Sequence, residues 1–510
     1  PGCRRNCKMA YHKPTYLFLF LPILLLIYQI APRKFRRGVL LGAGYLFFWS
    51  ISGKLVLYLI GTTIFTHYIG ICLELQESRK KKRLVLAGGV LLLLGVLGYL
   101  KYYNFFAENI SRMLEAAGSG MIIPARHLLL PIGISFYTLQ AISYIADVYW
   151  KKIPAEKNLM KLALFLGFFP QIMEGPISTY GQTAEAIFRC DPLRLENLSS
   201  GAVRILWGLF KKIVIADRLY TLVQAVFDNH ENFGGVIVFI AATAYTAQLY
   251  MEFSGCIDIV IGSARMFGVR LPENFRQPFA FRNAAEFWRR WHITLGEWFK
   301  AYVFFPVSVS GPVKKWNRYG RKKFGKYITK AGASAMALFP VWLGNGLWHG
   351  ARWSYIFFGM YYFAVLMAGI MAEPVRNKII KTLHINEDAS WFRALQIGKT
   401  WIIIIIGEMF FRANGLRAGI QMFQSMFGRP SGNLMTLGLD TADYVVILYG
   451  CAVVGLVGIL RERNLLDGHM LRNLKLPVRW AIYYGLILAV LIFGAYGVGY
   501  QQVDLIYAGF

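Results

Sequence analysis

The chain has 510 residues, of which 56% are hydrophobic, 16% aromatic and only 16% charged, and its mean hydropathy is +0.43. Soluble proteins normally carry about 25% charged residues, so this composition excludes a soluble globular protein and indicates a polytopic membrane protein. The formal net charge is +29. Because the basic runs adjoin apolar stretches, they favour membrane lipids over nucleic acid as a partner.

The chain is expected to begin with a tail, 1–14, in which 1–8 lie upstream of a start at Met9. The apolar stretch 16–31 has no small-residue cleavage pattern after it, which predicts an uncleaved first span rather than a signal peptide. No internal repeat, Pro-rich linker or soluble domain interrupts the rest. The sequence therefore predicts one multi-pass membrane domain over 15–510.

Apolar stretches of spanning or near-spanning length recur along the whole chain. They are 16–31, 55–75, 84–100, 128–149, 160–173, 202–226, 236–253, 331–348, 355–372, 401–411, 444–460 and 480–500. A span needs about 20 residues, so 160–173 and 401–411 predict partial, re-entrant or protein-buried helices. The fold class that follows is all-α, with about ten to twelve transmembrane or re-entrant helices.

Three basic runs predict which side of the membrane faces the cytoplasm. They are "RKFRR" at 33–37, "RKKKR" at 79–83 and the segment 314–330, which holds eight Lys and Arg and no acid. Cytoplasmic loops are enriched in Lys and Arg, so all three are expected on that side. The six cysteines lack metal-ligand spacing with a histidine, so the sequence predicts no disulfide framework and no metal site.

Acidic residues are rare inside the apolar stretches. Glu174, Glu252 and Asp258 stand out, because a carboxylate at membrane depth must pair, accept hydrogen bonds or become protonated. Arg265 lies two helical turns beyond Asp258, so a partner from elsewhere is needed. Structural ion pairing is the favoured interpretation for all three. The "FSG" at 253–255 predicts a helix interruption near a cavity.

The segment "EFWRRWHITLGEWFKAYVFFP" at 286–306 has the periodicity of an amphipathic helix. An aromatic and apolar face opposes a polar face that carries His292, and this pattern is typical of a helix in the membrane interface. Members of the first face are Phe287, Trp291, Leu295, Trp298 and Tyr302; those of the second are Arg289, His292, Gly296 and Lys300.

A second histidine stands in "LGNGLWHGARW" at 343–353, inside a stretch that otherwise resembles membrane interior. His349 lies between Trp348 and Trp353 and is bracketed by Gly346 and Gly350. Ionisable groups at membrane depth are rare and usually functional, although an interfacial histidine that caps a helix end is the plainer alternative. The glycines permit close approach of a substrate or, equally, of another helix.

Six motifs stand out along the chain. In chain order, they are "PIGISFYTLQAISYIADVY" (131–149), "FFPQIMEGPI" (168–177), "GLFKKIVIADRL" (208–219), "MEFSGCIDIVIGSARMFGVRLPENFRQPF" (251–279), "EFWRRWHITLGEWFKAYVFFP" (286–306) and "GNGLWHGARW" (344–353). Taken together, they resemble the bacterial branch of the membrane-bound O-acyltransferase superfamily, which includes alginate O-acetylation and teichoic acid D-alanylation proteins. The resemblance extends from about residue 16 to 411, and beyond that it lies only in hydropathy.

The resemblance implies a helical membrane fold with a central tunnel, in which His349 and His292 match the two family histidines. The chain departs from the family at Glu252, where Asp is commoner, and at Glu174, where a small residue is usual. It also has "GMYYF" at 359–363, where many relatives carry a further histidine. This loss leaves His349 as the one imidazole of its own region and puts in doubt a mechanism that needs a histidine pair there.

The chemistry of acyl transfer assigns roles to these residues. A desolvated, neutral His349 is the predicted base for an acceptor hydroxyl. Asn345 and the indole N–H of Trp348 or Trp342 are the predicted donors to an oxyanion. His292 is expected to position the acceptor or relay protons at a membrane boundary, to be easier to reach than His349, and to be kept neutral by nearby cations. Further substrate contacts are predicted at Trp291, Glu252 and Asp258.

The leading functional hypothesis is transfer of an acyl group, most simply acetyl, from a cytoplasmic thioester across a bacterial plasma membrane to an envelope polysaccharide. No Walker or dinucleotide motif is present, so no tightly bound cofactor is expected. The donor would be acetyl-CoA or a phosphopantetheine-linked acyl carrier protein, and an extracytoplasmic acyltransferase partner is expected. The alternatives are D-alanyl transfer to teichoic acid, a transporter or flippase, whose usual repeat symmetry is not found, and an assembly scaffold without chemistry.

Overall fold

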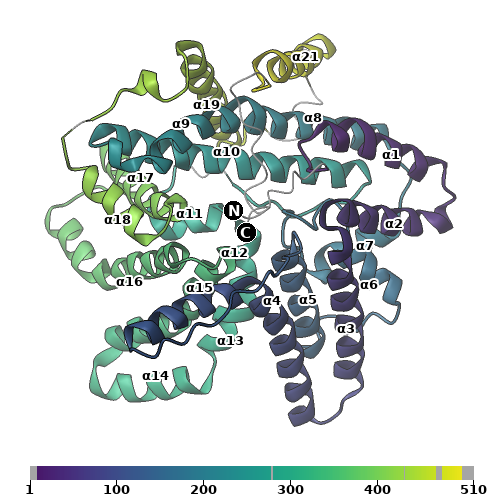
Figure 1. Cartoon of the computed structure of the whole chain (residues 1–510), viewed down its shortest axis with the longest axis horizontal. Helices are drawn as coiled ribbons and strands as arrows, with labels where there is room; N and C mark the ends of the chain where they lie inside the picture. The colour runs from purple at the N-terminus through teal and green to yellow at the C-terminus, as the bar shows by residue number, and fades with distance from the viewer. Residues whose placement is uncertain (1–8, 277–279, 430, 467–473, 497–510) are drawn as a thin grey trace. The chain divides into compact units, whose positions relative to one another are not determined.

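The computed structural model describes residues 9–276, 280–429, 431–466 and 474–496. In these ranges every regular element is a helix, and the β pairing consists of two isolated bridges (Figure 1). The predicted all-α class is confirmed. The described chain divides into two compact units, one of residues up to Leu209 with Gly255–Glu273, the other of Phe210–Ser254 with the chain from Asn274 onward. Of the predicted tail 1–14, residues 1–8 lie outside the described residues.

The first unit is built around a helix that is buried on all sides. Helix α5 is buried from Phe136 to Val148 and packs against α3, α4, α6 and α7. Its apolar residues occur on every side of the helix, and the polar residues between them are buried as well. The elements of this unit are π-helix Thr15–Phe20, α1 (Leu21–Ile30), α2 (Arg33–Ser52), 3-10 helix Gly53–Leu55, α3 (Val56–Leu75), α4 (Arg79–Ala116), α5 (Ile134–Tyr149), α6 (Leu159–Leu166), α7 (Tyr180–Arg189), α8 (Leu195–Leu209) and the last turns of α10 (Val236–Met266).

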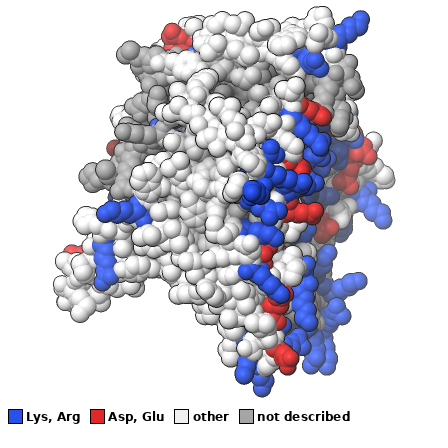
Figure 2. Space-filling view, turned by 90° about the vertical axis from the view of Figure 1, so that its right-hand side faces the viewer, with Lys and Arg blue, Asp and Glu red and all other residues white. Residues whose placement is uncertain are grey.

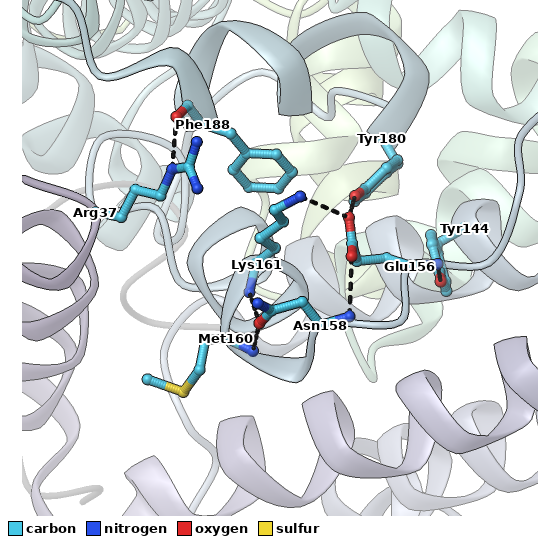
Figure 3. Close-up of polar contacts among 8 residues, drawn as sticks. All are labelled: Arg37, Tyr144, Glu156, Asn158, Met160, Lys161, Tyr180 and Phe188. Carbon is cyan, nitrogen blue, oxygen red and sulfur yellow. Dashed lines mark hydrogen bonds and ion pairs between the residues drawn. The ribbon is translucent and has the colours of Figure 1, made fainter. Parts of the chain in front are cut away.

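The predicted partial helix at 160–173 is confirmed. Helix α6 has only eight residues and then gives way to buried, non-helical chain. Its start is fixed by polar contacts: Asn158 Oδ1 accepts hydrogen bonds from the backbone N–H of Met160 and Lys161 at 2.9 and 3.3 Å (Figure 3). Glu156 in turn accepts from Asn158 N at 2.9 Å and from the Tyr180 hydroxyl at 2.7 Å. These bonds hold α6 and α7 together.

The second unit contains the remaining helices and both sequence-predicted histidines. Its elements are π-helix Phe210–Ala216, α9 (Asp217–Asp228), 3-10 helix His230–Asn232, the first part of α10, α11 (Ala284–Arg290), α12 (Ile293–Phe299), π-helix Lys300–Phe304, α13 (Phe305–Ser308), α14 (Gly311–Lys323), α15 (Gly325–His349), α16 (Trp353–Thr382), α17 (Ser390–Arg412), α18 (Leu416–Ser425), 3-10 helix Leu434–Thr436, α19 (Thr441–Glu462) and α21 (Leu476–Phe493).

Seven helical segments are long and apolar enough to cross a membrane, which identifies a multi-pass membrane protein. Thr15–Ile30 is a shorter apolar helix. On the face drawn in Figure 2, a broad area without charged residues adjoins a band rich in Lys and Arg. The seven segments are Arg33–Leu75, Arg79–Ala116, Val236–Met266, Trp353–Thr382, Ser390–Arg412, Thr441–Glu462 and Leu476–Phe493.

Two predictions about helix length are wrong. The stretch 401–411 is not a short buried helix, because α17 extends it backward to Ser390 and reaches 23 residues. Helix α10 is not interrupted at 253–255 and continues for 31 residues. Gly255 serves close packing instead: a Cβ on Gly208 of α8 would lie only 2.5 Å from the Gly255 carbonyl oxygen.

The basic helix α14 generates a topology prediction. We expect a Tyr319→Cys variant to resist an impermeant thiol reagent added to intact cells, because positive segments stay in the cytoplasm. Tyr319 is 51% exposed, so the thiol itself would be accessible. The matched control is the same labelling after membrane permeabilisation, in a background in which all six native cysteines are replaced by Ser so that position 319 carries the one thiol. Labelling of intact cells would place α14 on the outer side.

Candidate functional site

The predicted amphipathic helix over 286–306 is broken at its centre. Helix α11 ends at Arg290, Trp291 is extended, and His292 has the left-handed φ of +46° before α12 begins. The prediction of one continuous face is therefore wrong. A left-handed backbone is uncommon for a non-glycine residue and persists where the surroundings hold it. Here Arg276 N donates to the Arg290 carbonyl at 2.9 Å, and Ile293 N donates to the Asn274 carbonyl at 3.0 Å.

Asn274, which the sequence analysis missed, determines the protonation pattern of His292. Its side-chain Oδ1 accepts from Thr294 N at 3.1 Å and from Thr294 Oγ1 at 2.9 Å, so this atom is an oxygen and an acceptor. His292 Nδ1 lies 3.2 Å from the same oxygen and must donate to it. The proton of the neutral imidazole is thus on Nδ1, and the lone pair is on Nε2. Asn274 itself stood inside a quoted family motif.

His292 is buried and uncharged. The residue is 3% exposed, against 6% for His349, so the prediction that it is easier to reach is wrong, and its place at a membrane boundary stays a prediction. Desolvation by burial lowers its pKa to about 3, which keeps the ring neutral at pH 7. The predicted neutral state agrees with this shift, but burial rather than neighbouring cations is its main cause. Its ring packs 4.8 Å from that of Phe253.

His349 occupies the last residue of α15 and is enclosed by aromatic rings. The ring centroids of Phe411 and Trp348 lie 4.8 and 4.9 Å from its own, and that of Phe358 lies at 5.8 Å. The enclosure depends on close packing of α15 against α16, since a Cβ on Gly346 would lie 2.4 Å from the Tyr355 carbonyl oxygen. Gly346 is therefore needed for helix packing, one of the two roles predicted for it.

Trp348 brings the two predicted histidines into one neighbourhood. Its indole centroid is 5.5 Å from the His292 ring and 4.9 Å from the His349 ring, and it is itself 7% exposed. The two imidazoles, one after α11 and one ending α15, thus share a single buried aromatic neighbour.

Several buried polar atoms on the helices around His349 have no hydrogen-bond partner within the described part of the chain. Asn345 Oδ1 is one of them, and because an amide oxygen accepts, the oxyanion-donor role predicted for this residue stays a prediction. Such atoms are costly and concentrate at functional sites, because a ligand can satisfy them. The others were missed by the sequence analysis: Trp288 Nε1 of α11, Ser354 Oγ of α16 and Glu408 Oε1 of α17. Glu408 could have been found by the signal that identified Glu252, an acidic residue inside an apolar stretch, because it lies within 401–411.

The acidic residues of α10 form ion pairs, as predicted. Glu252 Oε1 lies 3.1 Å from Lys212 Nζ, which also contacts Asp217 Oδ1 at 2.8 Å. In the first unit, Asp258 Oδ1 lies 2.5 Å from Arg204 Nε. The partner of Asp258 is therefore Arg204 rather than Arg265, and sequence spacing alone could not identify it. The substrate contacts predicted for Glu252 and Asp258 stay predictions.

The other predicted side chains have clear structural surroundings. Trp291 is 6% exposed and packs among the rings of Phe275, Phe287 and Tyr250 at 5.1 to 6.0 Å, so its substrate contact also stays a prediction. Glu174 is buried, and its ion pairing stays a prediction. Among the described residues, no group of three His, Cys, Asp or Glu is placed to hold a metal ion.

Comparisons with known proteins place this geometry in a family. The model of the membrane-bound O-acyltransferase family matches residues 151–320. The probable alginate O-acetylase of Pseudomonas syringae pv. tomato is 34% identical over 465 residues, which cover 89% of this chain and 83% of the relative. The peptidoglycan O-acetyltransferase of Helicobacter pylori is 27% identical, covering 86% and 83%. The teichoic acid D-alanyltransferase of Bacillus subtilis is 27% identical, covering 56% and 70%.

The identity and coverage of the alginate O-acetylase extend the match well beyond residues 151–320. The matched part of the chain includes the positions of both histidines and the helices that enclose them. The fold, the multi-pass character and the sequence likeness agree, and the chain belongs to the membrane-bound O-acyltransferase family and is an acyltransferase.

Proposed function

We propose that this protein transfers acetyl groups from a cytoplasmic thioester to a polysaccharide of the bacterial cell envelope. Two relatives matched over more than 80% of this chain carry O-acetyl transfer to a polysaccharide or to peptidoglycan in their names. The relatives named for D-alanyl transfer to teichoic acid match only 56% and 55% of the chain. D-alanyl transfer is therefore the second candidate.

The observation that carries the proposal is the pair of buried imidazoles on either side of Trp348. In the proposed reaction, His349 takes the proton of an acceptor hydroxyl while the hydroxyl oxygen attacks the thioester carbonyl carbon. The carbon–sulfur bond then breaks, and the thiolate leaves with the proton from the His349 imidazolium. The ester stays on the acceptor, so atoms and charge balance. The Asn345 amide and an indole N–H of Trp348 or Trp288 would donate to the transient oxyanion.

His292 is better suited to position the acceptor than to act as the base. A general base works best with a pKa near the operating pH, and a pKa of about 3 lies far below it. Its Nε2 lone pair, fixed by the Nδ1 hydrogen bond to Asn274, is nevertheless a good acceptor for a hydroxyl proton donor. His292 would thus orient an acceptor hydroxyl, and His349 would remove its proton.

The donor, partner and location complete the proposal. The acyl group would come from acetyl-CoA or from a phosphopantetheine-linked carrier protein, with no tightly bound cofactor. An extracytoplasmic acyltransferase would complete delivery to the polymer. The protein would reside in the bacterial plasma membrane, with α14 and its eight-cation neighbourhood, 314–330, on the cytoplasmic side.

We expect His349→Ala to abolish acetyl esters on envelope polymers while the protein stays folded and membrane-inserted. The base is lost, which alone is worth roughly 10²–10⁴ in rate. Mass spectrometry of the polymers measures the esters and distinguishes acetyl from D-alanyl groups. The exposed His127 provides a matched control, and His127→Ala should keep full ester content. D-alanyl esters in the parent strain would favour the second candidate, and normal esters in His349→Ala would favour a scaffold.

Glutamine substitutions separate the two histidine roles. Glutamine keeps a hydrogen-bond acceptor but cannot take a proton at neutral pH, so we expect partial activity from His292→Gln and none from His349→Gln. Ester formation per folded protein is the measurement. Equal and complete loss in both variants would show that both imidazoles carry protons in the reaction.

The low pKa of His292 also predicts acid sensitivity of the fold. The unfolded chain binds a proton at this residue below its ordinary pKa of about 6.5, whereas the folded chain does not until about pH 3. Stability is therefore lost as the pH falls, by about 2 kcal/mol at pH 5 relative to neutral pH. Melting temperatures in detergent should fall less steeply between pH 7 and pH 5 for His292→Gln than for the parent. Parallel curves would refute the assignment.

A further inference from the structure

A surface pocket distinct from the histidine site lies where α13, α14 and the start of α15 meet, with α14 and α15 side by side (Figure 1). Its cavity volume is about 360 Å³, near the lower end for small-molecule sites. Lys330, on its wall, precedes His349 by 19 residues of α15, or about 28 Å at the helical rise. The pocket and the imidazoles are therefore at opposite ends of one helix.

The walls of this pocket are tightly built rather than loosely associated. A Cβ on Gly320 would lie 2.7 Å from Thr329 Oγ1, and one on Gly332 would lie 2.5 Å from the Trp316 ring. The Trp316 indole N–H also donates to the Thr329 carbonyl at 3.0 Å. Helices α14 and α15 thus approach closely at two glycines and are tied by a side-chain hydrogen bond, so the pocket is preformed.

The rim of the pocket is cationic. Arg321, Lys326 and Lys330 line it, and no acidic residue does. Within the described ranges, none of the three forms an ion pair. Lys326 and Lys330 lie in the first two turns of α15, where the helix dipole also favours an anion. The half-buried Asn317 adds an amide group between the cations and the interior.

Much of the remaining lining of the pocket is apolar, and its other members are the hydroxyl residues Ser308, Thr329 and Ser334. Val313 and Ala337 are 2% and 1% exposed, and Ala333 and Phe304 complete the apolar lining. A free phosphate would use the rim and leave this interior empty. A molecule with an anionic head and an apolar chain would fill both parts. In a membrane protein, the abundant molecule with this chemistry is an anionic phospholipid.

We propose that the pocket binds the phosphate headgroup of an anionic glycerophospholipid. The phosphate contacts Arg321, Lys326 and Lys330, and the first acyl methylenes lie over Ala333 and Ala337. A lipid bound there would link α14 to the first turns of α15, whose last residue is His349. The site does not depend on the acyl transfer proposed above, and its test measures binding alone.

The test is native mass spectrometry of the full chain in detergent with dioctanoyl phosphatidylglycerol. The triple variant Arg321→Gln, Lys326→Gln, Lys330→Gln should weaken binding by at least about tenfold, because three charge-assisted phosphate contacts are lost. The matched control removes three exposed cations that do not line the pocket, Lys315→Gln, Arg318→Gln, Lys322→Gln, and should change binding little. An equal loss in both variants would indicate diffuse surface attraction and overturn the proposal.

Further binding experiments distinguish a phospholipid from other molecules that carry phosphate. Ala333→Phe fills the apolar interior but keeps every rim cation, so it should weaken phosphatidylglycerol binding as well. Dioctanoyl phosphatidylcholine should bind at least about tenfold more weakly than phosphatidylglycerol, because it has no net charge to match the cations. Two results would overturn the proposal. One is equal binding of phosphatidylcholine and phosphatidylglycerol. The other is displacement of the lipid by equimolar inorganic phosphate or acyl carrier protein, together with no effect of Ala333→Phe.

Discussion

One oxygen atom, Oδ1 of Asn274, fixes the most unusual backbone of the candidate site. Three donors converge on it, Thr294 N, Thr294 Oγ1 and His292 Nδ1, all within 3.2 Å. The left-handed conformation at His292 turns its ring toward Phe253 and Trp348, whereas a continuous helix would have kept it on a polar face. Without this oxygen, the tautomer of His292 would lose its support, and the helix break would keep only its two backbone hydrogen bonds. The ring contact of His292 with Trp348 depends on that orientation.

Interactions of this kind cannot be predicted from sequence, whereas features set by hydropathy and charge can. The all-α class, the short helix within 160–173, and the ion pairs of Glu252 and Asp258 follow from hydropathy and charge. These features depend on composition or on residue types that a membrane tolerates only for a reason. The predicted short helix at 401–411 was wrong because hydropathy detects only the apolar part of α17 and misses its more polar first turns.

The helix break at 291–292 could not be predicted, for a different reason. The aromatic spacing from Phe287 to Tyr302 fits a helix well, and nothing local opposes it. The opposing interaction comes from residues 274–276, which bond across to residues 290–294. The 3.6-residue spacing of apolar residues shows which face of a helix is apolar. It does not show whether one or two residues within the pattern leave the helical conformation, because the spacing of their neighbours is unchanged. His292 appeared exposed in sequence because its helix neighbours are cationic, and it is buried because its backbone leaves that helix.

Burial of both imidazoles has opposite effects on two parts of the proposed chemistry. It lowers the pKa of His292, which weakens that ring as a base. The same exclusion of water strengthens fixed donors directed at a developing oxyanion. A site with a low dielectric therefore gains from keeping one imidazole neutral and oriented while another takes the proton. In the proposed site, the buried unpaired atoms of Asn345, Ser354 and Glu408 would regain hydrogen bonds from a polar substrate, because burial keeps water from them.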